Sequence, residues 1–371
     1  MIIDNYSAAN LRSIDFISFV PGPNINLIVG QNNAGKTSIL EGINVCSTLK
    51  SFKPVTTDSL VKGSKKELKI ALNVTKNNDK HIISLEKSLK SSISIKYDEK
   101  RVSASKLSLS FPVIALSFGT ENIINLGSDS RRSLLDWGAF HVEPSYLSLF
   151  KDYTKCLKQR NMLLRDRSSE NLDYWTEKLC SFGESLNTKR KSYFVRLLDQ
   201  YVHLINRFSV DKEVDIYDDI KNTTISYYHG WNGTPAMIDA VNLSIEKDRA
   251  LKYTTVGPHR ADIIITANNE LLKQTSSMST QVIVSLLLML AQCQVFHVEH
   301  EYRPILLIDD LFFGIDDKNL RLVINLLREL GAQCFLTAPD LYHEKLKSLD
   351  LEGKDTNIYK LIDGKITQEK Q

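Results

Sequence analysis

The sequence predicts an α/β protein in which a split phosphate-loop nucleotide-binding lobe is interrupted by an inserted helical arm. Three observations predict this architecture. A glycine-rich loop follows a short apolar run near the start of the chain, a second apolar run ends in two carboxylates far downstream, and a long helical stretch separates the two. Strands and helices that alternate with short loops are typical of a parallel α/β sheet.

The first 120 residues are expected to be mostly strands. Residues 2–19 alternate loosely between apolar and polar side chains, which predicts one or two edge strands. The short apolar run 24–29 ends at Gly30 and predicts a buried strand, and helical spacing follows over 38–49. Residues 67–120 have β-like composition, and a strand over 113–116 is expected to be the last of that set.

The middle of the chain is predicted to be helical, and the last third is predicted to alternate. Apolar residues at a period of 3.6 predict helices over 131–140, 146–167 and 172–208. The remaining elements expected, in order, are a strand over 216–228, a helix over 239–251, a strand over 263–265, a helix from about 281, a strand over 305–308, a helix over 318–330 and a strand over 333–337.

Composition limits the classes of function. The 371 residues include 47 Lys and Arg against 44 Asp and Glu, a net charge of +3, which excludes a purely electrostatic coat for nucleic acid but not a local basic groove. The five cysteines are scattered without a C-x-x-C pair, so a disulfide framework and a zinc site are not expected, and a reducing cytoplasm is favoured. The longest apolar stretch, near 282–291, covers about half of a membrane span, so no membrane partner is expected.

The segment from residue 30 to residue 37 matches the phosphate-loop pattern G-x-x-x-x-G-K-[ST] and lies between a predicted strand and a predicted helix. Backbone N–H groups at such a turn, together with the helix N-terminus, attract anions. Lys36 would reach the β- and γ-phosphates, and the Thr37 hydroxyl would bind Mg²⁺. The predicted nucleotide-binding residues are Gly30, Gln31, Asn32, Asn33, Ala34, Gly35, Lys36, Thr37 and Ser38. The alternative is a glycine turn that matches the pattern by chance.

Asp309 and Asp310 follow the apolar run 305–308. Carboxylates at a strand end beside a phosphate loop are placed to hold a metal ion and a water. Asp309 is therefore predicted to orient Mg²⁺ and its waters together with Thr37, and Asp310 to polarise the attacking water. The alternative is an ordinary aspartate-rich turn.

Lys36 and Asp309 are 273 residues apart (309 − 36), whereas a single strand–helix–strand unit needs only about 30. A large insertion between two halves of one nucleotide-binding lobe explains the distance. The expected halves are 1–120 and 252–371, and the expected helical arm is 121–251. By analogy of fold, a split lobe of this kind suggests the SMC and ABC-type ATPases.

Longer strings sharpen this interpretation. Residues 130–144 (SRRSLLDWGAFHVEP), 157–165 (LKQRNMLLR), 254–262 (TTVGPHRAD), 40–43 (LEGI) and 51–53 (SFK) occur in the order seen in the RecF family of recombination mediators, over almost the whole chain. The chain is therefore identified as a member of the RecF family by resemblance. The strings G-P-H-R-A-D and K-Q-R-N are far more specific than the phosphate loop.

The resemblance implies a DNA replication and repair protein. Such a protein binds ATP with Mg²⁺, forms an ATP-dependent homodimer, and binds single-stranded and gapped duplex DNA. With its partners RecR and RecO it supports recombinase loading and the SOS response. The resemblance also implies that Ser277 takes part in nucleotide binding, as the serine of the signature loop L-S-x-G-Q, which completes the ATP site of the other subunit.

The chain departs from the family in the part of the site that acts across the dimer. The signature segment is Ser276-Ser-Met-Ser-Thr280, so Ser279 and Thr280 replace the glycine and the glutamine. Ile114 stands where the family has a metal-sensing glutamine. Asn33 replaces a phosphate-loop glycine, and asparagine is the best substitute for glycine at a position with positive φ. The enzymatic activity expected is therefore at most that of a weak DNA-dependent ATPase.

Two other functions remain open at this stage. One is a RecF-derived DNA-binding scaffold with a vestigial nucleotide site that does not hydrolyse ATP. The other is a small-molecule kinase, which the long arm disfavours. Among the basic residues, the run 189–191 is expected to be a solvated helix face with DNA phosphate as the alternative, and Lys53 is a candidate contact for nucleotide or DNA.

Overall fold

We describe the protein from a computed structural model over residues 1–51, 56–63, 65–117, 122–166, 170–208, 220–233, 236–312, 314–340 and 355–369. The chain divides into two compact units, Met1–Asn122 with Val282–Gln371, and Ile123–Gln281. We expected the return to the first unit near residue 252, whereas residues 252–281 lie in the second. Their strand β10 (Asp262–Ala267) pairs with β9 (Thr223–Tyr228) of the same unit, which explains the later boundary.

The first unit contains two six-stranded sheets. The antiparallel sheet has the order β2-β1-β4-β5-β6-β7, formed by Ile14–Phe19, Ile2–Leu11, Glu67–Lys76, Asp79–Ser88, Ser94–Tyr97 and Lys100–Arg101. The second sheet has the order β15-β14-β3-β13-β12-β8, formed by Lys365–Gln368, Thr356–Ile362, Ile25–Gly30, Cys334–Pro339, Ile305–Asp309 and Val113–Ser117. Its described strands pair in parallel, except for β14 with β15.

Two strand expectations need correction. β1 lies between β2 and β4 and is not an edge strand. β8 does not complete the antiparallel set, because it pairs in parallel with β12, nearly two hundred residues downstream. A short apolar run predicts a buried strand but carries no information about its partner, which long-range pairing decides.

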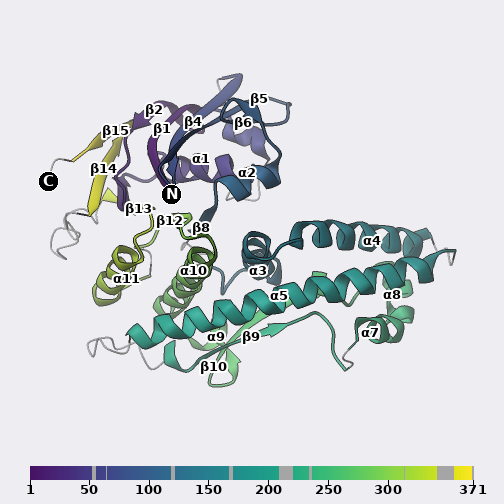
Figure 1. Cartoon of the computed structure of the whole chain (residues 1–371). Coiled ribbons are helices and arrows are strands. Elements are labelled where there is room, and N and C mark those ends of the chain that lie inside the picture. Colours follow the sequence, from purple (N-terminus) through teal and green to yellow (C-terminus); the bar gives the residue numbers. More distant parts are fainter. Residues whose placement is uncertain are drawn as a thin grey trace. The chain divides into compact units, whose positions relative to one another are not determined.

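Helix α1 (Lys36–Thr48) packs between the two sheets of the first unit. One apolar core joins Ile39 and Ile43 of α1 to Tyr6 of β1 and Leu307 of β12. Figure 1 shows α1 on one side of strands β12 and β13, with α10 (Met278–His300) and α11 (Asp317–Leu330) on the other side. The layered arrangement of helices and parallel strands confirms the predicted α/β class. Short helices α2 (Ala104–Ser110) and η1 (Thr57–Leu60) complete the unit.

The second unit is mostly helical, as predicted. Its long helices are α3 (Ser128–Val142), α4 (Tyr146–Asp166) and α5 (Leu172–Phe208), and α4 runs beside α5 in Figure 1. The smaller elements are α7 (Met237–Leu243), α8 (Ile245–Leu251), η2 (Pro258–Arg260), α9 (Leu272–Thr275), and a sheet in the order β11-β10-β9 with β11 at Glu270–Leu271. Residues 216–219 of the expected strand 216–228 lie outside the described residues.

Helix α10 is longer than its apolar run suggested. It has 23 residues and a mean hydropathy of 1.7 over its most apolar window, enough to span a membrane by length and composition. However, 83% of that window is buried inside the structure, as expected of a core helix rather than a membrane span. All five cysteines are buried and free.

Candidate nucleotide site

The phosphate loop lies where β3 ends and α1 begins, as the pattern predicts. β3 is buried throughout, and Gly30 must be glycine because a Cβ there would lie 2.5 Å from the backbone oxygen of Leu361. Gly35 precedes α1 with φ 105 and ψ 12, and no side chain caps the first turn of the helix. The N–H groups at this helix start are therefore available to an anion.

The middle of the loop is exposed and turned. Ala34 donates its N–H to the carbonyl oxygen of Gln31 at 3.2 Å, and Gln31, Asn32 and Asn33 are exposed. Asn33 adopts φ 66, the left-handed conformation that asparagine tolerates better than other residues with a side chain. Ser38 lies half-buried in the first turn of α1. The candidate residues 30–38 thus form one continuous strand–loop–helix segment.

The Lys36 side chain folds back over the loop. Its Nζ donates to the carbonyl oxygens of Gly30 at 2.8 Å and Gln31 at 2.9 Å, and the residue is 7% exposed. Burial lowers the pKa of the ammonium, and the nearby carboxylates Asp310 and Asp309 oppose this shift. A phosphate at the loop would offer the buried cation a stronger partner than two neutral carbonyls.

Thr37 and Asp309 meet at the carboxyl edge of the parallel strands. The Thr37 hydroxyl donates to the two oxygens of the Asp309 carboxylate, at 2.9 and 3.1 Å. Thr337 of β13 donates to the same carboxylate at 2.6 Å and fixes its orientation. Two oxygens that bind one Mg²⁺ at right angles, each about 2.1 Å from the ion, are about 3 Å apart. The spacing between the Thr37 hydroxyl oxygen and the Asp309 carboxylate oxygens therefore suits Mg²⁺.

Asp310 lies directly after the β12 strand, in a left-handed backbone conformation with φ 56. Its backbone N–H donates to the Thr337 hydroxyl at 2.9 Å. In the neighbouring strand, Ser117 is the residue opposite Asp309. Ile114 pairs with Leu306 inside the sheet, so it lies too far from the strand ends to take the place of a metal-sensing side chain.

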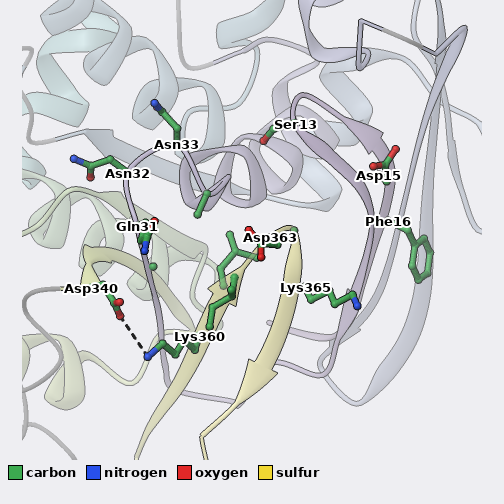
Figure 2. A pocket seen from close by; sticks show the side chains of 15 residues that line it. Ser13, Asp15, Phe16, Gln31, Asn32, Asn33, Asp340, Lys360, Asp363 and Lys365 are labelled. Atoms are coloured by element: carbon green, nitrogen blue, oxygen red, sulfur yellow. Dashed lines mark ion pairs between the residues drawn. The ribbon is translucent and has the colours of Figure 1, made fainter.

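A cavity of about 920 Å³ adjoins the phosphate loop on the side of β14. Figure 2 shows Gln31, Asn32 and Asn33 at one wall. The other walls come from the β14–β15 hairpin and from β2, with Lys360, Asp363, Lys365 and Phe16 among the lining residues. Lys360 pairs with Asp340 at 3.7 Å. This wall was not expected, because the sequence predicts no strand after residue 337.

The string Leu40-Glu-Gly-Ile43 has a structural explanation. Arg12, in the turn between β1 and β2, donates to both carboxylate oxygens of Glu41, at 2.7 and 2.8 Å. A Cβ at Gly42 would lie 2.4 Å from the Tyr6 hydroxyl. These contacts hold α1, and with it the phosphate loop, against the antiparallel sheet. Lys53 of the neighbouring string lies outside the described residues.

The signature segment forms the start of α10. Thr280 donates its backbone N–H to the Ser277 Oγ at 3.2 Å, and the two hydroxyls are 3.0 Å apart. Thr280 is fully buried. Ser277 therefore acts as an N-cap of its own helix, and Thr280 has an internal structural partner.

The basic residues of the arm are mostly engaged in structural contacts. Arg190, expected on a solvated face, is 2% exposed and binds Asp136, Tyr146 and the carbonyl oxygen of Pro258. That expectation is wrong for Arg190, because its position on α5 faces the interior of the unit. Arg131 likewise donates to both carboxylate oxygens of Asp262, at 2.7 and 2.9 Å.

The two strings most typical of the family meet in the interior of the second unit. Arg160 and Asp248 are both completely buried and form an ion pair of 2.7 Å. Arg160 also donates to the Thr254 hydroxyl at 2.7 Å, and the Tyr153 hydroxyl lies 2.6 Å from His259 Nδ1. We call Arg160, Asp248, Thr254, His259 and Tyr153 the arm lock. Through Thr254 it joins Arg160 of K-Q-R-N to His259 of G-P-H-R-A-D, so these two side chains have structural roles. Lys158 and Arg260 of the same strings are exposed.

Comparison with known proteins identifies relatives that cover almost the whole chain. Residues 3–112 match a family model described as an AAA domain. The DNA replication and repair protein RecF of Francisella tularensis subsp. tularensis is 30% identical over 97% of this chain and 99% of its own. The RecF proteins of Francisella tularensis subsp. novicida and subsp. holarctica match to the same extent.

Solved structures show the same fold. A structure of the recombination mediator protein RecF with ATP in the RecFOR pathway has a TM-score of 0.80 at 23% identity, covering 99% of each chain. The Smc head domain from Pyrococcus furiosus, bound to the C-terminal domain of ScpA, has a TM-score of 0.56 at 12% identity, covering 99% of this chain and 96% of its own. The predicted relationship to the SMC and ABC-type fold is therefore confirmed.

Proposed function

Because this chain belongs to the RecF family of DNA replication and repair proteins, we propose that it binds ATP and Mg²⁺ at the phosphate loop and binds DNA at single-strand gaps. In this role it would act in the cytoplasm with RecO and RecR to support loading of a recombinase. The related structures of RecF with ATP, described as part of the RecFOR pathway, support the choice of nucleotide and of partners.

The observation that carries the nucleotide proposal is the contact between Thr37 and Asp309. Two segments 272 positions apart in the sequence bring a hydroxyl and a carboxylate to 2.9 Å, with the uncapped start of α1 beside them. An ordinary aspartate-rich turn has no reason to meet the first turn of this helix. Bound Mg²⁺ would neutralise phosphate charge at this position.

The residues take distinct roles in this proposal. Lys36 binds the β- and γ-phosphates as a point charge, and Thr37 and Asp309 hold Mg²⁺. Asp309 is kept in orientation by Thr337. Asp310 is the candidate for polarising water, so hydrolysis at this site would depend on a residue that follows the metal-binding carboxylate directly.

Replacement of Lys36 tests the assignment. Lys36→Ala removes the cation that the loop directs at the phosphates, so a fluorescent ATP analogue should bind this variant at least tenfold more weakly than the parent, a loss of about 1.4 kcal/mol or more. Lys106→Ala, at an exposed position of α2, is the matched control and should bind as the parent does. Equal binding by Lys36→Ala and the parent would show that the phosphate loop does not hold the nucleotide.

The second candidate is a DNA-binding scaffold whose nucleotide site does not hydrolyse ATP. It is favoured by the signature segment, in which Ser277 and Thr280 bind each other and Ser279 replaces a glycine. A side chain at that glycine position obstructs close approach of backbone to phosphate. ATP hydrolysis measured with gapped DNA separates the two candidates: turnover that DNA stimulates supports the ATPase, and its absence with intact ATP binding supports the scaffold.

A further inference from the structure

Helix α4 carries a row of exposed basic side chains on one face. Tyr153, Cys156, Arg160 and Leu164 form its buried face. The opposite face presents five exposed residues, Lys151, Lys155, Lys158, Met162 and Arg165. These five residues, separated by alternating steps of four and three, are here called the α4 stripe. At 1.5 Å per residue the stripe is about 21 Å long.

No acidic side chain that the structure describes forms an ion pair with the α4 stripe. None of its four cations forms an ion pair or hydrogen bond with any residue that the structure describes. At about 100° per residue, Asp152 and Asp166 lie to the side of the row rather than within it. Lysines at positions i and i+4, such as Lys151 and Lys155, repel each other and destabilise a helix by a few tenths of a kcal/mol.

Other charged faces of the same unit differ in this respect. Glu246 pairs with Arg249 on α8, and Glu143 pairs with Lys189 and Arg196 of α5. A solvated helix face usually mixes the two signs in this way. The α4 stripe keeps a repulsive arrangement instead, which favours a polyanionic partner that would remove the repulsion.

Helix α5 adds to this basic surface. Burial and the Asp152 carboxylate raise the pKa of the Cys156 thiol, and the cations Lys155 of α4 and Lys178 of α5 oppose the shift. The Lys178 ammonium lies 5.9 Å from the centre of the Tyr174 ring, and Tyr174 is 53% exposed. Lys178 is thus a further exposed cation at the start of α5, where Asp173 and Glu177 are also exposed.

We propose that the α4 stripe binds the phosphate backbone of DNA, as a surface separate from the nucleotide site. The inference rests on the proposed function, in which the chain binds DNA. Protein interfaces centre on buried apolar and aromatic anchors, whereas DNA interfaces are strongly basic, and the α4 stripe contains a single apolar residue, Met162. Contacts of lysine and arginine with phosphate position DNA without reading its sequence.

Salt dependence tests the proposal in the full-length protein. The variant Lys151→Gln, Lys155→Gln, Lys158→Gln removes three cations from the stripe. The control removes the same charge elsewhere, by the changes Lys247→Gln, Arg249→Gln and Lys252→Gln. These exposed residues lie on α8 or directly after it. Affinity for a gapped duplex is measured by fluorescence anisotropy between about 50 and 200 mM salt. The slope of log affinity against log salt should become shallower by about 2.7 in the stripe variant, at ~0.9 per lost phosphate contact, and stay unchanged in the control.

Each other outcome overturns the proposal in its own way. A slope unchanged in the stripe variant overturns it and leaves an acidic protein as the partner of this face. An equal loss of slope in stripe variant and control attributes the effect to net charge and also overturns it. If the unaltered protein fails to bind gapped DNA, the proposed function itself is wrong, a result distinct from failure of the stripe alone. Melting temperature and binding of an ATP analogue should match the parent in both variants, which excludes misfolding as the cause.

Discussion

The phosphate loop and the arm lock are both rich in family-typical polar residues, yet they use them in opposite ways. In the phosphate loop, Gln31, Asn32 and Asn33 are exposed along a cavity of about 920 Å³. In the arm lock, Arg160 and Asp248 are completely buried and bind each other. A motif rich in polar residues therefore does not show whether those residues bind a ligand or each other. The burial of their side chains distinguishes the two cases.

The difference follows from where the hydrogen-bonding groups find partners. The N–H groups at the start of α1 have no side-chain cap among the residues that the structure describes, which suits a bound anion. The Asp248 carboxylate, by contrast, accepts from Arg160 through one oxygen and from the Thr255 N–H at 2.9 Å through the other. Replacing a residue of the phosphate loop should therefore weaken nucleotide binding. Replacing a residue of the arm lock should instead destabilise the folded protein.

Arg160→Ala is expected to have the largest effect. It leaves the Asp248 carboxylate buried without its cation, which costs about 3–5 kcal/mol of unfolding free energy. Chemical denaturation measures the loss, and Arg249→Ala, which breaks an exposed pair with Glu246, should change stability by no more than about 0.5 kcal/mol. If the two variants are equally stable, the arm lock does not hold the unit together.

The arm lock should also make stability depend on pH. His259 Nε2 lies 3.0 Å from the carbonyl oxygen of Thr254, which can only accept, so the neutral ring carries its proton on Nε2 and accepts from Tyr153 on Nδ1. Burial lowers the pKa of His259 to about 4. Between about pH 6.5 and 4 the unfolded chain binds a proton that the folded chain does not, so stability is complete above pH 6.5 and falls below it.

Denaturation at several pH values measures this effect. The parent should lose up to about 1.4 kcal/mol per pH unit below pH 6.5 through this histidine, or about 2 kcal/mol by pH 5. His259→Gln should flatten that part of the profile, because glutamine does not titrate. His203→Gln, at an exposed position of α5, is the control and should keep the parent's profile. Identical profiles for His259→Gln and the parent would contradict the assigned tautomer and its burial.

Thr37→Val should affect binding rather than folding. The change removes the hydroxyl that faces Asp309 but keeps the shape of the side chain, so affinity for an ATP analogue in the presence of Mg²⁺ should fall about tenfold, or 1.4 kcal/mol. In EDTA the two proteins should bind alike, and Thr37→Ser should behave as the parent. If ATP-analogue affinity depends on Mg²⁺ equally in Thr37→Val and in the parent, Thr37 does not bind the metal ion.

Ser277→Ala is expected to have the smallest effect of these changes. The Ser277 hydroxyl caps α10, so its loss should cost about 1 kcal/mol of unfolding free energy. Ser185→Ala is the control, since that exposed serine lies inside α5 and bonds only back to Ser181 among the described residues, and it should be neutral or slightly stabilising. A Ser277→Ala protein as stable as the parent would leave the hydroxyl free to serve a nucleotide instead.

Much of the site could be predicted from local sequence. The phosphate loop was located because its strand, glycines and helix are consecutive, and Asp309 was located because it ends a buried run of four apolar residues. The hairpin wall with Lys360 and Lys365 was not predicted, because its strands have mixed polarity and give no clear period. The return of the chain was placed too early, because the pairing of β10 with β9 has no local signal.

The α/β class, the helical arm, the phosphate loop and the family could all be predicted from the amino-acid sequence. These features depend on periodicity, glycine placement and short strings, which act over a few residues. The pairing of β8 with β12, the burial of Arg160 and Arg190, and the exposure of the α4 stripe became known from the three-dimensional structure. Partners distant in the chain are chosen by burial and pairing in three dimensions, and a residue's charge alone does not tell whether it meets solvent, ligand or another side chain.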